Sequence, residues 1–312
     1  MKHICKILLP ILLALGLIIG IFIFAEEISA LKHSLYSHIV KGSVSTESTE
    51  ATEPTEETVS LEALYDSFPV FTHSEDAWYQ NNHLVYHAGG GIDGLAYTNS
   101  KEAIEANLPH ANVMEIDFFY TSDHQLVCIH SWSYITGSDI PMTTDQYRDH
   151  KVFGRYTTVD AQYIIDIMEE NKDLYVIIDT KEVDCVSVIR DLIDLADNRK
   201  DITDRFVIQL FDRGIKAQLT ELYPFAEHQF LFTCYKFSTD PDDILRVCME
   251  ENIAIVTVDY RTWSADVVER FAQKGILIFE HTVNRLDYAH EAMSRGVYGL
   301  YTDFLTVSDL SQ

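Results

Sequence analysis

Apolar and polar residues alternate along the chain in two kinds of run from about residue 84 to the C-terminus. Short apolar runs bounded by polar residues or glycine predict buried strands. Eight such runs lie near residues 84, 115, 176, 208, 232, 256, 278 and 300. Between them, apolar residues recur at helical spacing, as at Ile164, Ile167 and Met168. Asp240 and Pro241 mark a helix start, because a capping acid precedes a proline at the first helical position.

Strands that alternate with helices in this way predict an α/β fold with a parallel sheet, and eight of them predict a closed (β/α)8 TIM barrel. An open doubly wound sheet is disfavoured, since no Gly-rich dinucleotide turn opens a helix directly after a strand. Residues 126–130 are expected to form an extra short strand after the second barrel strand. Residues 132–156 are rich in Gly, Pro, Thr and Asp and are expected to form a loop insertion.

The N-terminus has a different pattern. Basic residues precede an uncharged apolar run over residues 7–25, and two glutamates follow it. The run approaches the ~20 residues that a membrane-spanning helix needs. A cleaved signal peptide is the alternative, but bulky Ile23 occupies a position where a cleavage site requires a small residue. We expect residues 1–26 to form an uncleaved single-pass anchor in the cell membrane, with the rest of the chain extracytoplasmic.

Two further segments complete the predicted organisation. Residues 27–60 comprise a juxtamembrane segment and a Ser/Thr/Glu-rich linker with few large apolar residues in its second half. Such a composition cannot bury enough surface to offset ordering, so this linker is expected to be a disordered stalk. Residues 61–312 have roughly the length of one large domain.

The net charge of −26 disfavours nucleic acid as a partner and disfavours unaided docking on anionic lipid. An anionic substrate would therefore need local cations, either a bound metal or a lysine such as Lys181. The five cysteines form no disulfide framework. Four of them occupy apolar positions, which favours buried free thiols over disulfides.

Polar residues that could act as acids, bases or metal ligands cluster between residues 87 and 130. His87 ends a short strand and precedes three glycines, a pattern that suits close approach of backbone to a ligand. Glu115 and Asp117 are two positions apart on one strand, so both point to the same face, with Cα atoms roughly 6.6 Å apart. Such a pair is costly on a buried face unless a cation or a basic group neutralises it. His130 follows the next apolar run, and two imidazoles with two acids fit metal-assisted acid–base chemistry.

The order of these motifs resembles the glycerophosphodiester phosphodiesterase family, which is related to phosphatidylinositol-specific phospholipases C. The family pattern is His-Arg-Gly, Glu-Asn-Thr, Glu-Leu-Asp, His-Asp and Glu-x-Lys. Its counterparts here are residues 87–89, 98–100, 115–117, 130–131 and 179–181, and residues 282–284 and 299–303 match two further family signatures.

Four positions depart from the family pattern. Ala88 replaces an arginine, Thr98 a glutamate, Ser131 an aspartate and Asp179 a glutamate. We interpret the chain as a divergent member in which the core chemistry is kept and the substrate contacts are altered.

The resemblance implies roles for the matching residues. His87 and His130 would divide the general acid and general base roles, with Lys181 assisting. Glu115, Asp117 and Asp179 would hold a divalent cation, Ca²⁺ or Mg²⁺, which all-oxygen ligation suits. Three more residues are candidates for substrate binding: Asn99, Lys236 and His281.

Each candidate also has a structural alternative. The histidines could be strand-end residues with satisfied hydrogen bonds, the carboxylates salt-bridged, Lys181 solvent-facing and Asn99 a helix cap.

The resulting expectation is a metal-dependent phosphoric diester hydrolase that acts on glycerophosphodiester-like substrates, free or derived from lipid or polymer. Two other classes stay open. A catalytically inactive, membrane-tethered binding module would account for Ala88 and Thr98. A glycoside hydrolase would use paired carboxylates roughly 5–9.5 Å apart, but would leave two histidines and a lysine unexplained.

Overall fold

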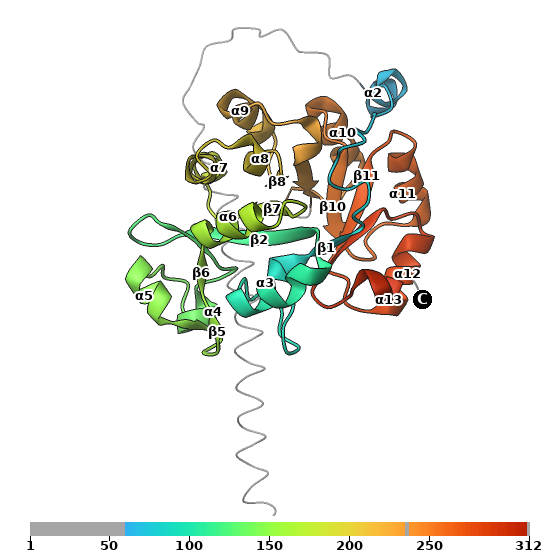
Figure 1. Cartoon of the computed structure of the whole chain (residues 1–312). Coiled ribbons are helices and arrows are strands. Elements are labelled where there is room, and N and C mark those ends of the chain that lie inside the picture. Colours follow the sequence, from blue (N-terminus) through green and yellow to red (C-terminus); the bar gives the residue numbers. More distant parts are fainter. Residues whose placement is uncertain (1–59, 235–236, 311–312) are drawn as a thin grey trace, which may run out of the picture. The chain divides into compact units, whose positions relative to one another are not determined.

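The computed structural model describes residues 60–234 and 237–310. Eight parallel strands pair in chain order and close into a barrel, with helices around its outside (Figure 1). Closure is made by the pairing of β1 with both β2 and β12. All eight strands lie where the apolar runs predict them, which confirms the barrel. They are β1 (Leu84–Tyr86), β2 (Val113–Tyr120), β7 (Tyr175–Thr180), β8 (Phe206–Leu210), β9 (Phe230–Thr233), β10 (Ile255–Asp259), β11 (Leu277–His281) and β12 (Gly299–Thr302).

At least one helix lies between each barrel strand and the next, and a C-terminal helix follows β12. The predicted cap at Asp240 is confirmed, since its side chain accepts a hydrogen bond from the backbone N–H of Asp242. Ser100, not Asn99, caps the helix after β1. The helices are α2 (Leu61–Ser67) before the barrel, then α3 (Lys101–Asn107), α6 (Ala161–Glu170), α7 (Cys185–Leu195), α8 (Lys200–Thr203), α9 (Ile215–Leu222), α10 (Pro241–Glu251), α11 (Ala265–Ala272), α12 (Leu286–Ser294) and α13 (Val307–Leu310).

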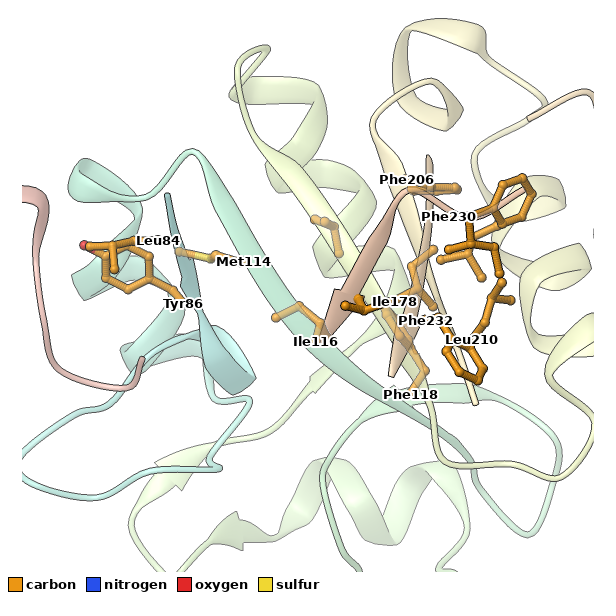
Figure 2. Close-up of a cluster of buried hydrophobic side chains, with 14 of the residues drawn as sticks. Leu84, Tyr86, Met114, Ile116, Phe118, Ile178, Phe206, Leu210, Phe230 and Phe232 are labelled. Carbon is orange, nitrogen blue, oxygen red and sulfur yellow. The ribbon is translucent and has the colours of Figure 1, made fainter. Parts of the chain in front are cut away.

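Side chains alternate across each strand and thereby divide the core in two. The outward set packs against the helices and forms the larger cluster. Figure 2 shows part of it, with side chains from β1, β2, β7, β8 and β9. The inward set fills the barrel with Val85, Val113, Ile177, Val207 and Leu231, all fully buried. Further along each strand the inward positions become polar, so the same alternation that builds the core also directs polar groups into the barrel mouth.

The amino-terminal end of the barrel is closed by aromatic residues that precede β1. The Trp78 indole N–H donates to the His228 carbonyl at 2.8 Å, and its ring lies 5.3 Å from that of Phe279. Trp78 and Tyr79 are 1 % and 2 % exposed. This floor leaves the carboxyl-terminal end as the open end of the barrel.

The insertion after β2 differs from the predicted irregular loop. The expected extra strand is present as β3 (Leu126–Cys128), which pairs antiparallel with β2 and with β6 (Val159–Asp160). The following segment is folded, with α4 (Ser133–Thr136), α5 (Thr144–Asp149), β4 (Lys151–Val152) and β5 (Tyr156–Thr157). These elements lie together beside β6 in Figure 1.

Burial of two rings and a capping box explain why this polar segment is ordered. Trp132 and Tyr147 are each 1 % exposed and meet edge to face at 5.7 Å. Thr143 and Gln146 form the capping box of α5. The composition of the segment therefore conceals a small satellite core.

The predicted membrane anchor and nearly all of the predicted stalk lie outside the described residues. Within residues 60–234 and 237–310, no helix combines the length and hydropathy that crossing a membrane requires. The four cysteines in that part of the chain are free thiols. Cys128, Cys234 and Cys248 are buried as predicted, whereas Cys185 is half-buried.

Candidate active site

A cavity of about 220 Å³ opens at the carboxyl-terminal end of the barrel. Its walls come from β1, β2, β7, β8, β10, β11 and β12 and from the loops after them. Six residues predicted from the sequence lie on those walls, namely His87, Glu115, His130, Asp179, Lys181 and His281. Residues that are far apart in the sequence are thus brought to one place, as barrel strand ends require.

Three carboxylates meet at this cavity, and two of them, Glu115 and Asp179, line it. One oxygen from each of Glu115, Asp117 and Asp179 lies within 4.8 Å of the others. The Lys181 ammonium is 2.6 Å from both aspartates. Burial opposes its charge, but the surrounding carboxylates outweigh burial and raise the pKa of Lys181 far above its usual value. Gln209 donates a further hydrogen bond to Asp179 at 3.0 Å.

Glu115 has one oxygen that receives a hydrogen bond and one that does not within the described part of the chain. Its Oε2 accepts a hydrogen bond from the Ala88 backbone N–H at 2.7 Å, but its Oε1 is buried without a hydrogen-bond partner among the described residues. Burial and then the charge of Asp117 raise the pKa of Glu115 to about 8. A divalent cation would relieve this repulsion, and three carboxylates are the hard oxygen donors that Mg²⁺ and Ca²⁺ prefer. The residues present therefore fit a divalent metal site.

Asp117 is held by an amide clamp. The Asn99 side chain donates to Asp117 Oδ2 at 2.6 Å, and its own oxygen accepts from the Asp117 backbone N–H at 3.0 Å. Although burial opposes ionisation, the charge of Lys181 lowers the pKa of Asp117 to about 2. Asn99 was predicted to bind substrate, but it is fully buried and both ends of its amide serve Asp117. The structure places it behind the carboxylate, where it positions Asp117.

His87 is oriented by a carboxylate at the other end of the chain. Its Nδ1 donates to Asp303 Oδ1 at 2.9 Å, and Asn284 donates to the second oxygen of Asp303 at 2.6 Å. The Nε2 atom of His87 then lies 3.8 Å from Glu115 Oε2. Burial opposes the imidazolium form, but the hydrogen bond to Asp303 and the charges of Glu115 and Asp303 outweigh it and raise the pKa of His87.

His281 is in direct contact with His87 in the cavity wall. Their Nε2 atoms are 3.3 Å apart, and the two rings meet edge to face at 4.8 Å. Burial, followed by the charge of His87, lowers the pKa of His281 to about 3. His281 is therefore neutral and can accept a hydrogen bond from protonated His87. Its predicted position on the pocket wall agrees with the structure.

Tyr97 connects the two predicted catalytic histidines. Its ring lies 4.6 Å from that of His87 and 4.7 Å from that of His130. His130 is also stacked on Tyr134, at 5.7 Å and 11°. His87 and His130 thus both contact the ring of the same tyrosine.

Sequence reasoning missed the roles of Asp303, Asn284 and Tyr97. Asn284 and Asp303 lie within the two C-terminal signatures, so the motif match was a signal that could have assigned them. Tyr97 lies in the loop after β1 with a backbone φ of 61°, and no periodic pattern identifies it.

The positions that depart from the family pattern fall in different surroundings. The Ala88 backbone, with φ 50°, turns its N–H toward Glu115. The Thr98 hydroxyl lies 3.0 Å from that of Ser100, and the Ser131 hydroxyl donates to Asp139 at 2.9 Å. The fourth departure, Asp179, keeps its carboxylate in the cluster. Lys236, predicted to bind substrate, lies outside the described residues.

Several solved structures similar to this chain are described as glycerophosphodiester phosphodiesterases or phosphodiesterases. One from Parabacteroides distasonis is 20 % identical, with a TM-score of 0.59 over 74 % of this chain and 96 % of its own. A phosphodiesterase from Oleispira antarctica, solved with the product sn-glycerol-3-phosphate, is 13 % identical, with a TM-score of 0.58 over 77 % and 95 % of the two chains. A third, from Thermotoga maritima, is 19 % identical, with a TM-score of 0.52 over 72 % and 95 %.

At the level of sequence, neither protein-family models nor curated proteins gave a match. The structural likeness therefore establishes the fold. The barrel is the one used by glycerophosphodiester phosphodiesterases, in agreement with the resemblance of the sequence motifs. Because one barrel hosts many chemistries, the function has to be argued from the site.

Proposed function

We propose that this protein is a metal-dependent phosphodiesterase that hydrolyses glycerophosphodiester-like substrates. The observation that carries the proposal is the arrangement at the barrel mouth. A buried cluster of three carboxylates and one lysine lies beside His87, which Asp303 orients, and His130 lines the same cavity. With a divalent cation bound to the carboxylates, this set would supply positive charge for a phosphate and two groups that exchange protons.

The two histidines carry the proposed proton transfers. In hydrolysis, the attacking oxygen loses a proton as it bonds to phosphorus, and the leaving alcohol gains one as its P–O bond breaks. The raised pKa of His87 favours its protonated form, and neutral His281 receives its Nε2 hydrogen in the absence of substrate. We therefore assign the general acid to His87 and the general base to His130.

Negative charge on the phosphoryl oxygens would be offset by the bound cation and by Lys181. When bound by Glu115, Asp117 and Asp179, a divalent cation would stabilise negative charge that develops on the phosphate. Lys181 lies beside two of these ligands and adds a fixed positive charge. Because its pKa is raised, Lys181 stays protonated and contributes charge, not proton transfer. Ca²⁺ and Mg²⁺ both suit the oxygen donors.

The geometry argues against the two alternatives. In a glycoside hydrolase the paired carboxylates face each other across a sugar, whereas Asp117 and Asp179 share one ammonium group. In an inactive binding module, a buried Glu115 oxygen without a hydrogen bond, in a carboxyl group with a raised pKa, would destabilise the fold without serving the function. Both features are expected where catalytic or metal-binding function maintains them.

An assay of hydrolysis with and without EDTA tests the proposal. The substrates are glycerophosphocholine, glycerophosphoethanolamine and glycerophosphoglycerol, with an aryl β-glucoside as the comparison. We expect turnover of at least one glycerophosphodiester, its loss in EDTA and its recovery with Ca²⁺ or Mg²⁺. Absence of any phosphodiester cleavage with either cation would support the inactive module, and cleavage of the glucoside would support the hydrolase.

We propose in addition that the enzyme acts outside the cell membrane, attached by residues 1–26. The support is the uncharged run over residues 7–25 without a cleavage motif. N-terminal sequencing of the protein from a membrane fraction checks this, because a mature N-terminus near Glu26 would show that the segment is cleaved.

A further inference from the structure

Large apolar side chains that face solvent are concentrated at the mouth of the barrel. Eleven such residues are exposed in the described part of the chain, and seven of them lie in loops that follow barrel strands. We call these seven the rim residues. They are Leu95, Ile140, Phe153, Val183, Phe237, Tyr260 and Phe304. Six of the eight strand-to-helix connections contribute at least one of them.

The rim residues border the candidate active site. Val183 lies two positions after Lys181, and Tyr260 directly follows Asp259, which also lines the cavity. Phe153 packs on Tyr134 at 4.8 Å, and Tyr134 is the residue stacked on His130. Exposed apolar groups thus surround the cavity on several sides.

This distribution is not what burial alone predicts. Single exposed apolar residues are ordinary, but their concentration around one opening marks an interaction surface. Val183 is 99 % exposed and Ile140 73 % exposed, so neither contributes to the core. Transfer of either side chain from water to an apolar phase would be favourable.

We propose that the rim residues dock the barrel mouth on a lipid surface with zwitterionic or uncharged headgroups. The arginines of the strand-to-helix loops support this choice over anionic lipid. In two loops that carry rim residues, Arg155 pairs with Asp93 and Arg261 with Glu291. In the two loops that carry none, Arg213 pairs with Glu250 and Arg285 with Asp287. Anionic lipid is recognised by clusters of unpaired Lys and Arg, and the net charge of −26 would oppose it further.

The length of chain that precedes the domain permits this orientation. Tyr65 of α2 hydrogen-bonds to Arg270 and Gln273 at the C-terminal end of α11, so the chain enters at the end of the barrel opposite the mouth. Residues 26–59 separate the apolar run from α2, and a chain of that length spans at most roughly 110 Å. That reach exceeds the dimension of one domain, so a membrane-attached chain can turn its mouth toward the bilayer.

A second copy of the chain is a less suitable occupant of this surface. Two mouths that dock on each other would close both cavities and block entry of substrate. A lipid surface presents its headgroups to the cavity and leaves the site accessible from the membrane. Docking of this kind is separate from the proposed hydrolysis and would place the active site against the lipid surface.

Tryptophan quenching in vesicles tests the docking directly. The native tryptophans of the described chain, Trp78, Trp132 and Trp263, are 4 % exposed or less, so an added tryptophan at the rim can be followed separately. We would place full-length V183W in phosphatidylcholine vesicles with brominated or ordinary acyl chains. The matched control is V70W, because Val70 is also exposed but lies before β1. We expect brominated lipid to quench the V183W reporter and to leave V70W at the level of the unsubstituted chain.

Three further results decide the interpretation. In an I140S/V183S background, an F153W reporter should lose its quenching, because the two most exposed anchors are gone. Equal quenching of V183W and V70W would overturn the proposal, as would absence of quenching in both. Quenching that appears only in vesicles with added phosphatidylglycerol would overturn the choice of lipid. None of these readouts requires turnover, so they are independent of the proposed activity.

Discussion

At the scale of single residues, the two histidines differ in what holds them. His87 has a carboxylate partner in Asp303, while His130 is set by the rings of Tyr97 and Tyr134. A buried carboxylate on Nδ1 fixes the tautomer of an imidazole and stabilises its charged form. The ionisation of His87 is therefore tied to Asp303.

Replacing Asp303 by asparagine should change the pH dependence of the reaction. The hydrogen bond and charge of Asp303 raise the pKa of His87, so their loss should lower it. If protonated His87 is the acid, the alkaline limb of the kcat/KM profile should move to lower pH and the maximum rate should fall. The control is Asp194→Asn, an exposed carboxylate on α7. An unchanged alkaline limb in Asp303→Asn would show that His87 is not the group that titrates there.

Replacing either histidine should reduce turnover strongly. A positioned acid or base typically contributes about 10²–10⁴-fold in rate, and we expect His87→Ala and His130→Ala each to lose that order. The double variant should lose much less than the product of the two, because one transfer is of little use without the other. Stabilisation by metal should persist, and exposed His110→Ala should behave as wild type. Near wild-type turnover in both single variants would contradict the assignment.

At the scale of elements, the barrel was predictable because each strand carries its own signal. The runs over residues 84–86, 174–178 and 206–208 are apolar on both faces, as parallel strands covered by helices must be. The folded insertion was not predictable, since its order depends on the burial of Trp132 and Tyr147 against residues outside the segment. Local composition there indicated a loop, and tertiary packing decided otherwise.

The candidate site was likewise predictable only in part. Glu115 and Asp117 share a face by the period of a strand, and Asp179 pairs with Asp117 in the register of β2 and β7. The bond between His87 and Asp303 joins positions 216 residues apart, which no spacing rule can foresee. The position of Tyr97 between the two histidines likewise depends on a loop backbone that the sequence pattern does not determine.

The start of β12 offers a test of packing between neighbouring strands. Gly299 pairs with Phe279, and a Cβ added at Gly299 would lie 2.3 Å from that ring. The ring is fully buried against Trp78 and has little room to move. Gly299→Ala should therefore lower the free energy of unfolding by about 1–3 kcal/mol, as overpacked cores do. Denaturant unfolding measures the loss, and Phe279→Leu in the same background should recover part of it. A fully stable Gly299→Ala would show that β11 and β12 are less tightly packed.

At the scale of the whole molecule, an acidic protein holds a further buried concentration of negative charge at its mouth. The carboxylates there are balanced by Lys181 and, when protonated, by His87. Without a cation, burial raises the pKa of Glu115 to about 8, so ionisation of this group at neutral pH destabilises the folded state. Metal binding and the stability of the barrel should consequently be linked.

The domain that begins at α2 should fold alone and report this linkage. The barrel and its floor lie within the described residues, and α2 is capped by Ser60, so a fragment of residues 60–312 should melt cooperatively. Ca²⁺ or Mg²⁺ should raise its Tm, because a ligand that binds only the native state stabilises it by mass action. Glu115→Gln should lose most of that increase, while Glu221→Gln, at an exposed position on α9, should keep it. Scanning calorimetry with and without EDTA measures both effects. An equal rise in Tm for wild type and Glu115→Gln would exclude Glu115 as a ligand, and a broad, non-cooperative melt would show that the fragment lacks part of the folding unit.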